Sequence, residues 1–263
     1  MITAGIDAGV ETTKAVVLKD GKVAGRAIAS TGGIDRPVQI SKAYNEALKE
    51  AGVAESDVEA VIATGKGKFD VPFASGHVTN TIAAAYAARN ADAGATSVIS
   101  VGADETLAAT LGDDRLVKEF VVNQKCTAGL GTFLKYLAKR LEIPLEETGL
   151  DTPDAGPINE GCVVFSELDA LSLLNNGAAP KSVMASAVKA AAVRAANVMN
   201  DLTLQANDRA ILIGGLTKNA LFVSALEGLV GFKYIIPDDA EYCCAIGAAL
   251  SGGKVKRESF ANW

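Results

Sequence analysis

The chain contains an internal repeat, and this feature constrains its fold more than any other. Residues 6–30, IDAGVETTKAVVLKDGKVAGRAIAS, align without gaps on residues 99–123, ISVGADETLAATLGDDRLVKEFVVN, at an offset of 93. Gly9 then falls on Gly102. Each copy is typical of an apolar strand, a glycine-containing turn and two further strands joined by a second turn. A chance similarity between two short hairpins is the alternative that the sequence leaves open.

Helical and strand patterns follow each copy of the repeat. This alternation predicts an α/β fold with two lobes, residues 1–92 and 93–263, that face each other across a cleft. The closing helix belongs to the second lobe in this division. The expected helices are 37–51, 77–90, 128–141, 163–176, 180–206, 218–229 and 241–251, and the strands after the repeats are 58–65, 209–215 and 233–237.

Composition excludes several classes of protein. With 263 residues, 49% of them apolar, the chain is long enough to bury a substantial core. No apolar run approaches the roughly 20 residues that span a bilayer, and the N-terminus lacks the basic start and cleavage site of a signal peptide. The net charge is −6, and the sequence shows no cluster of lysine and arginine residues that would form a basic face. We therefore expect a cytoplasmic protein that binds neither nucleic acid nor membrane.

The segment GIDAGVETTK, residues 5–14, is a candidate phosphate loop. Its turn offers backbone N–H groups and threonine hydroxyls to a phosphate, and Asp7 to a Mg²⁺ ion or an attacking water. A plain hairpin turn that needs glycine is an equally good interpretation. The loop's candidate nucleotide-binding residues are Gly9, Thr12, Thr13 and Lys14. ATGKGK, residues 63–68, departs from the P-loop pattern, and its lysines are expected to be solvated.

The segment LIGGLTKN, residues 212–219, is more informative. A buried strand ends in Gly214 and Gly215 and then leads into a helix that begins near Asn219. Paired glycines let a flat ring approach the backbone, and a helix N-terminus favours negative charge. These three residues are therefore candidates for nucleotide binding. Tight packing between strand and helix is the alternative reason for the two glycines.

Two cysteines share a setting that favours a negatively charged group. Cys126 and Cys162 each follow a polar turn at the start of an amphipathic helix, where the helix dipole favours a thiolate. Together they make half of the four-thiolate set that a [4Fe–4S] cluster takes, so a second chain would supply the rest. Ordinary buried thiols are the alternative. Cys243 and Cys244 are expected to pack in the closing helix, and His77, the single histidine, near a helix N-terminus.

The order of these segments resembles the ASKHA superfamily, which includes actin, Hsp70 and sugar kinases. The resemblance implies two phosphate loops and an adenosine loop around bound ATP or ADP with Mg²⁺. Asp7 would lie in the first phosphate loop, Gly102 and Ala103 in the second, and Gly214 with Gly215 beside the adenosine. The repeat places Ser100 where many relatives carry a second catalytic aspartate. Asp104 or Glu105 would then supply the missing carboxylate.

The cysteine motifs resemble a narrower family. KCTAGLGTF and GCVVFSE, in an ASKHA frame, look like the activator ATPases of benzoyl-CoA reductases and 2-hydroxyacyl-CoA dehydratases, of BadF/BadG/BcrA/BcrD type. The resemblance implies a [4Fe–4S] cluster shared between Cys126 and Cys162 of two homologous subunits. It also implies ATP-driven electron transfer from a ferredoxin-like donor to acyl-CoA-reducing or dehydrating subunits. The irregular loop SVGADE favours the small ATPase subunit of a benzoyl-CoA reductase over a dehydratase activator.

Two rival functions belong to other classes. A small-molecule kinase of the same superfamily would use Asp7 as its general base, although 263 residues leave little chain for a sugar pocket. A non-catalytic nucleotide-binding regulator is compatible with the irregular second loop. Both rivals predict that loss of Cys126 has little effect.

Overall fold

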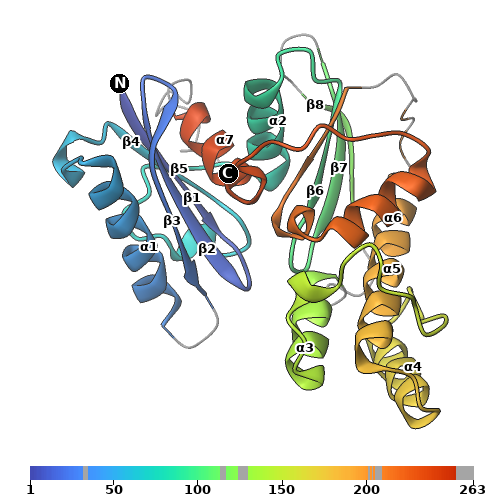
Figure 1. Ribbon diagram of the computed structural model, residues 1–263. Coiled ribbons are helices and arrows are strands. Elements are labelled where there is room, and N and C mark those ends of the chain that lie inside the picture. Colours follow the sequence, from blue (N-terminus) through green and yellow to red (C-terminus); the bar gives the residue numbers. More distant parts are fainter. Residues whose placement is uncertain are drawn as a thin grey trace. The chain divides into compact units, whose positions relative to one another are not determined.

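The computed structural model describes residues 1–31, 35–112, 117–123, 130–200, 202, 204 and 209–252 (Figure 1). These residues form two compact units. Of the described residues, the first unit contains Met1–Ala95, Leu111, Gly112, Val117 and residues 241–252, and the second contains those within Thr96–Thr110 and Lys118–Ala240. Each unit holds a mixed sheet with helices packed on it, which confirms the predicted α/β class.

The first unit is built on a five-stranded sheet. Its strands are β1 (Ile2–Ala8), β2 (Thr12–Lys19), β3 (Lys22–Ser30), β4 (Ala60–Thr64) and β5 (Gly76–His77). They follow the order β3-β2-β1-β4-β5. β1 is antiparallel to β2 and parallel to β4. The β2–β3 hairpin turns at Asp20 and Gly21, which both have positive φ, as its Asp-Gly sequence predicts.

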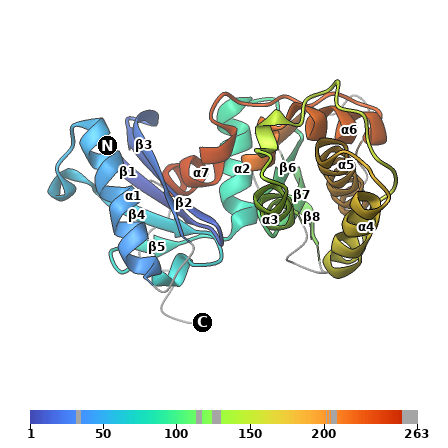
Figure 2. The ribbon, with the colours of Figure 1, turned by 60° about the horizontal axis from the view of Figure 1, so that its bottom comes forward.

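The two faces of this sheet are covered by different helices. α1 (Arg36–Ala51) packs on one face, where Ala4, Ile6 and Ala8 of β1 enter its apolar core. On the other face Val16 and Leu18 of β2 pack against α7 (Cys243–Ser251). Figure 2 shows the strands between α1 and α7. α2 (Asn80–Ala91), which Thr79 caps, packs beside α7.

The helix α7 belongs to a different unit from the one that we expected from the sequence. The sequence analysis assigned residues 241–251 to the second lobe, whereas the structure packs α7 against β1, β2 and α2 of the first unit. The approach is so close that a Cβ on Gly5 would overlap the Ala245 carbonyl, and one on Gly247 that of Ala83. Small residues on both sides of these contacts decide where the helix packs.

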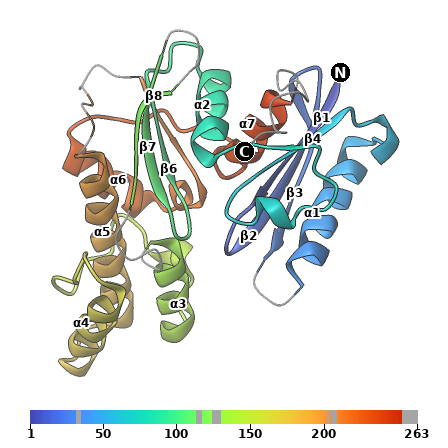
Figure 3. The same cartoon turned by 180° about the vertical axis from the view of Figure 1, so that it is seen from behind.

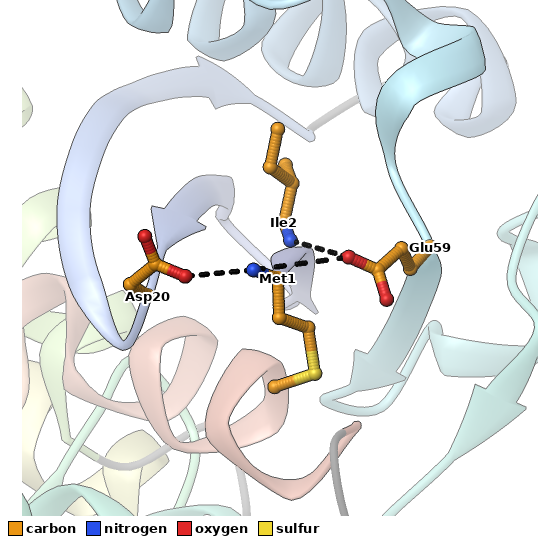
Figure 4. Close-up of polar contacts among 4 residues, drawn as sticks. All are labelled: Met1, Ile2, Asp20 and Glu59. Atoms are coloured by element: carbon orange, nitrogen blue, oxygen red, sulfur yellow. Dashed lines mark hydrogen bonds and ion pairs between the residues drawn. The ribbon is translucent and has the colours of Figure 1, made fainter.

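The start of β1 is fixed by two acidic side chains (Figure 4). The amino group of Met1 lies 2.7 Å from Asp20 Oδ1 and 3.9 Å from Glu59 Oε1. The N–H of Ile2 donates to Glu59 Oε1 at 3.0 Å. These contacts connect β1 to the β2–β3 turn and to the residue that precedes β4. All three charged groups are exposed, so their contribution to stability is small.

The second unit repeats the strand arrangement of the first. Its strands are β6 (Ser97–Val101), β7 (Thr106–Leu111), β8 (Val117–Val122) and β9 (Ala210–Ile213), in the order β8-β7-β6-β9. β6 is antiparallel to β7 and parallel to β9, as β1 is to β2 and β4. The expected strand at 233–237 makes a single bridge, between Ile235 and Ile211.

Register confirms the sequence repeat. Asp7 pairs with Lys14 across β1 and β2, and Ser100 pairs with Leu107 across β6 and β7. Both members of the second pair lie at the predicted offset of 93. The turns match as well, because the N–H of Gly9 donates to the Thr12 carbonyl at 3.1 Å and that of Gly102 to the Glu105 carbonyl at 2.9 Å. The two copies of the repeat therefore form hairpins with the same register and the same turn hydrogen bond.

Helices α3 to α6 complete the described part of the second unit. α5 lies beside α6, as Figure 3 shows from behind, and both contribute to the core around the buried β6 and β9. α5 ends at Met199, short of the expected end at 206. The helices are α3 (Gly131–Leu141), α4 (Val163–Asn175), α5 (Pro180–Met199) and α6 (Ala220–Val230).

Candidate functional site

Asp7 lies at the carboxyl end of β1, opposite Lys14 of β2. Its Oδ2 atom is 3.8 Å from Lys14 Nζ, and each side chain is 16% exposed. Burial raises the pKa of the Asp7 carboxyl, and the charge of Lys14 opposes that rise. A carboxylate whose pKa is raised accepts a proton more readily than an ordinary aspartate. The pair therefore places a carboxylate that can act as a base beside a cation that can contact a phosphate.

Gly65 lies directly against Asp7 and was not among the predicted site residues. It follows β4, whose Thr64 is the register partner of Asp7. With φ of 89°, Gly65 approaches so closely that a Cβ would stand 2.5 Å from the Ala8 carbonyl oxygen and 2.7 Å from Asp7 Oδ1. The signal was present in the sequence, because VEAVIATG indicates a strand that ends in a glycine turn. Only strand order shows that this turn adjoins Asp7.

Asn80 and Gly67 hold this second turn in place. The Oδ1 atom of Asn80 accepts from the N–H of Gly65 at 2.8 Å and from Thr64 Oγ1 at 3.1 Å. The N–H of Gly67 donates to the Ala8 carbonyl at 2.9 Å. Beyond the turn, Lys66 is exposed, and Lys68 Nζ lies 4.9 Å from the centre of the Phe69 ring. Burial, with the charge of Lys68, lowers the pKa of His77 in β5.

The predicted residues of the first loop fall into two groups. Gly9 and Thr12 lie in the β1–β2 turn and are partly exposed, as Lys14 is. Thr13 is fully buried on the opposite face of β2, and its hydroxyl lies 3.0 Å from that of Thr31. Alternation along a strand explains the difference. Thr13 is therefore directed into the protein interior and away from the Asp7 face.

In the second unit, two predicted loops lie at neighbouring strand ends. Gly102, Ala103, Asp104 and Glu105 follow β6, and Gly214 follows β9, the parallel neighbour of β6. Carboxyl ends of adjacent parallel strands are where α/β sheets bind ligands. The four residues after β6 are all partly exposed. Asn123 fixes their turn, since its Oδ1 accepts from the N–H of Thr106 at 2.7 Å.

The paired glycines at the end of β9 have different surroundings. Gly214 has φ of 107°, and a Cβ there would overlap the backbone of Val101, so the fold itself requires this glycine. The N–H of Gly214 also donates to the Ala240 carbonyl at 2.8 Å. A Cβ on Gly215 would meet no atom of the described residues within 4 Å. Tight packing thus explains Gly214, whereas open space lies in front of Gly215.

The third residue predicted in this segment has a structural role. Asn219 is 4% exposed, and its Oδ1 caps α6 by accepting from the N–H of Phe222 at 2.8 Å. Its Nδ2 donates to the carbonyl oxygens of Leu145 at 2.8 Å and Thr148 at 3.4 Å. The amide is therefore engaged at both ends, and it connects the 145–148 turn to α6.

Cys162 is the N-cap residue of α4 and is partly exposed. The N–H groups of Gly161 and Cys162 both donate to Asn159 Oδ1, at 2.9 and 2.8 Å. Ser166 Oγ donates to the carbonyls of Asn159 and Cys162, at 2.6 and 2.9 Å. This turn presents the Cys162 thiol at the positive end of a helix. Cys126, the other predicted ligand, lies outside the described residues.

Cys243 is 3% exposed in α7, and burial raises the pKa of its thiol to about 12. Such a thiol stays protonated and packs as an apolar group, as expected from the sequence. Within the described residues, no three His, Cys, Asp or Glu side chains gather as metal ligands. In the same part of the chain, no helix is long and apolar enough to cross a membrane.

Comparison with known proteins decides the family. The BadF/BadG/BcrA/BcrD ATPase family matches residues 4–252. The chain belongs to this family. An activator of lactoyl-CoA dehydratase from Anaerotignum propionicum is 32% identical, over 95% of this chain and 96% of its own length. A benzoyl-CoA reductase subunit from Thauera aromatica is 29% identical, over 95% of this chain and 93% of its own length. The predicted family is therefore confirmed.

Solved structures confirm the fold. The activator of the 2-hydroxyisocaproyl-CoA dehydratase from Clostridium difficile, with bound ADPNP, matches 96% of this chain and 94% of its own, with TM-score 0.86 and 26% identity. A ROK family glucokinase from Streptomyces griseus matches with TM-score 0.61 and 14% identity, a similarity of fold alone. The family thus has the expected two-sheet ASKHA-type architecture, which sugar kinases share.

Proposed function

We propose that the protein is an ATP-hydrolysing iron–sulfur subunit that delivers low-potential electrons to an acyl-CoA-reducing or dehydrating partner. The observation that carries the proposal is the composition of the second unit. Its two glycine loops lie at neighbouring strand ends, and the same unit contains Cys162 at the head of α4. Loops of this kind can bind a nucleotide, and a thiolate at a helix N-terminus can bind an iron–sulfur cluster, so this one unit would hold both parts of the proposed function.

ATP or ADP, with Mg²⁺, is the proposed nucleotide. Gly9, Thr12 and Lys14 would contact phosphates in the first unit, and Gly102 and Ala103 in the second. Asp7 would orient and deprotonate the attacking water, since burial raises the pKa of its carboxyl. Asp104 and Glu105 are the proposed carboxylates for Mg²⁺. Gly215 would face the adenosine, because the space in front of it is open.

We propose a [4Fe–4S] cluster that two chains share, and the position of Cys162 supports it. Cys162 is partly exposed at a helix N-terminus, whereas the buried Cys243 is held as a neutral thiol. We propose Cys126 and Cys162 of each chain as the four ligands. When bound, such a cluster supplies one-electron transfer at low potential. The hydrogen bonds of Asn159 and Ser166 fix the backbone that presents Cys162.

A second homologous ATPase subunit is the proposed partner at this site. Four apolar side chains of α4 are exposed, beginning two residues after Cys162, and an apolar surface of this kind is normally covered by another chain. A ferredoxin-like protein would donate the electron, in the cytoplasm. The exposed residues are Val164 at 65%, Phe165 at 58%, Leu168 at 55% and Leu171 at 40%.

The proposal names the chemistry that the two kinds of relative share. A dehydratase activator and a reductase subunit match at 32% and 29% identity, each over 95% of the chain. The irregular loop SVGADE favoured the reductase subunit in the sequence analysis. Supplying the reduced protein and ATP to each kind of partner separates the alternatives, since only the true partner is reduced.

The deciding experiment is purification without oxygen, followed by counts of iron and acid-labile sulfide. We expect four irons per dimer, and loss of most iron in Cys126→Ala and in Cys162→Ala. Cys244→Ala in α7 is the matched control and keeps its iron. A colourless, iron-free protein that still hydrolyses ATP would sink the electron-transfer proposal. Phosphorylation of a sugar by that protein would favour the kinase function instead.

A further inference from the structure

The Asp7 carboxylate is oriented by packing and by charge. Its Oδ2 atom lies 3.8 Å from Lys14 Nζ, beyond hydrogen-bond distance, and within the described residues neither carboxylate oxygen accepts a hydrogen bond. Its Oδ1 atom lies against Gly65, where a Cβ would stand 2.7 Å from it. The terminal torsion of an aspartate has broad minima, so the carboxylate needs such a contact to keep one orientation. The position of Gly65 therefore decides which way Asp7 faces.

Gly65 is held by a single atom of another element, Oδ1 of Asn80. This oxygen accepts from the N–H of Gly65 at 2.8 Å and from Thr64 Oγ1 at 3.1 Å. Thr64 is the register partner of Asp7, so both donors lie beside the carboxylate. Glycine has the widest conformational freedom of any residue, and Gly65 has φ of 89°. The two hydrogen bonds of Asn80 restrict that freedom.

Asn80 itself lies on a well-supported part of the backbone. It is the first residue of α2, which follows β5, and β5 pairs with β4 so that His77 lies opposite Ala63. The N–H of Val78 donates to the Ala63 carbonyl at 2.9 Å, and Thr79 Oγ1 caps the helix by accepting from the N–H of Ile82 at 3.3 Å. These contacts do not involve the Asn80 side chain. That side chain can therefore be changed while its backbone stays in place.

We infer that Asn80 is a positioning residue, which acts through Gly65 to hold the Asp7 carboxylate in the orientation that activates water. The inference rests on the proposed function for the role of Asp7. Without the amide oxygen, Gly65 gains freedom, and its contact with Oδ1 no longer keeps the carboxylate in one orientation. A misplacement of a reacting group by about 1 Å can lower a rate about 10²-fold. Loss of the amide therefore slows hydrolysis.

The test measures kcat and KM for Mg·ATP in Asn80→Ala. Alanine is a good helix former, so α2 should still form. We expect kcat to fall at least about tenfold and KM to stay within about threefold, because the orientation of a base matters in the transition state and little for binding. Thr79→Ala is the matched control, since it weakens the same helix end and leaves both hydrogen bonds of Asn80 intact. It should change neither constant by more than about threefold.

Two further variants separate positioning from a purely structural role. Asn80→Asp keeps an acceptor oxygen for both donors, so it should return kcat to within about threefold of the unaltered protein. In an Asp7→Asn background, Asn80→Ala should change kcat by less than about twofold, because the carboxylate through which Asn80 acts is absent. Melting curves of every variant show that the assays are made on folded protein.

The inference is overturned if folded Asn80→Ala hydrolyses ATP as fast as the unaltered protein. An equal loss of kcat with and without the Asp7 carboxylate would also overturn it, since Asn80 would then act independently of Asp7. A higher KM with unchanged kcat would overturn it as well, because Asn80 would then contribute to nucleotide binding.

Failure of the proposed function gives different results. In that case the unaltered protein hydrolyses no ATP, or it hydrolyses ATP and contains no iron. In the iron-free case the comparison of Asn80 variants keeps its meaning, because it depends on hydrolysis and not on electron transfer.

Discussion

Asp7 and Lys14 face each other across β1 and β2, with Oδ2 and Nζ 3.8 Å apart. Burial raises the pKa of the carboxyl even though a cation lies opposite it. The charged form of Asp7 is therefore less stable in the folded protein than in the unfolded chain. Residues that are kept for function often carry such a cost in stability.

Asp7→Asn should raise Tm at pH 7 and lower ATP turnover about 10²–10⁴-fold. The sign follows from the raised pKa: stability contributed by a neutral Asp7 is present at low pH and lost as pH rises from the unfolded pKa through the folded one. The gain in Tm from Asn should therefore shrink as pH is lowered from 7 towards 4. Thermal melts of both proteins across this range measure it. An equal gain at every pH would contradict the assignment of the raised pKa to Asp7.

Gly65→Ala should weaken nucleotide binding and destabilise the protein. The left-handed backbone costs an alanine roughly 1–2 kcal/mol, and overpacking against Ala8 and Asp7 adds about 1–3 kcal/mol. Gly52→Ala is the control, because Gly52 also has positive φ but its Cβ would meet nothing within 4 Å. Urea unfolding and ADPNP titration give the two quantities. Equal losses in both variants would show that the contact with Asp7 has no effect.

Asn219→Ala should reduce stability by about 2–4 kcal/mol, because it removes a helix cap and leaves the carbonyl groups of Leu145 and Thr148 with fewer partners. Nucleotide affinity of the folded fraction should stay within about threefold, since the amide is engaged in structural hydrogen bonds. Thr79→Ala, which removes only the cap of α2, should cost about 1 kcal/mol. A stable Asn219→Ala protein that binds no ADPNP would show instead that Asn219 contributes to nucleotide binding.

Iodoacetamide should modify Cys162 and spare Cys243 in the iron-free folded protein at pH 8. Cys162 is partly exposed, whereas burial raises the pKa of the Cys243 thiol to about 12, so almost none of it is thiolate. Peptide mass spectrometry of the labelled protein measures both sites. Labelling after unfolding in urea is the control and should modify both. Rapid labelling of native Cys243 would mean that α7 opens.

The sequence by itself determined the repeat, the α/β class and the positions of the glycine turns. These features are local: strand alternation, an Asp-Gly hairpin and a glycine at a strand end depend on neighbours along the chain. The family resemblance seen in the cysteine and glycine motifs was confirmed by the family match over residues 4–252. The offset of 93 between the two copies reappears in the register of both sheets.

Tertiary structure alone decided which segments meet. Gly65 adjoins Asp7 because β4 is the parallel neighbour of β1, and the order of strands in a sheet is not a local property. Burial assigned Thr13 and Asn219 to structural contacts, although their residue types suit a phosphate loop equally well. α7 packs in the first unit, where Gly5 allows the backbone of Ala245 to approach closely. Packing between residues far apart in the chain sets each of these relationships, and no pattern of neighbours encodes it.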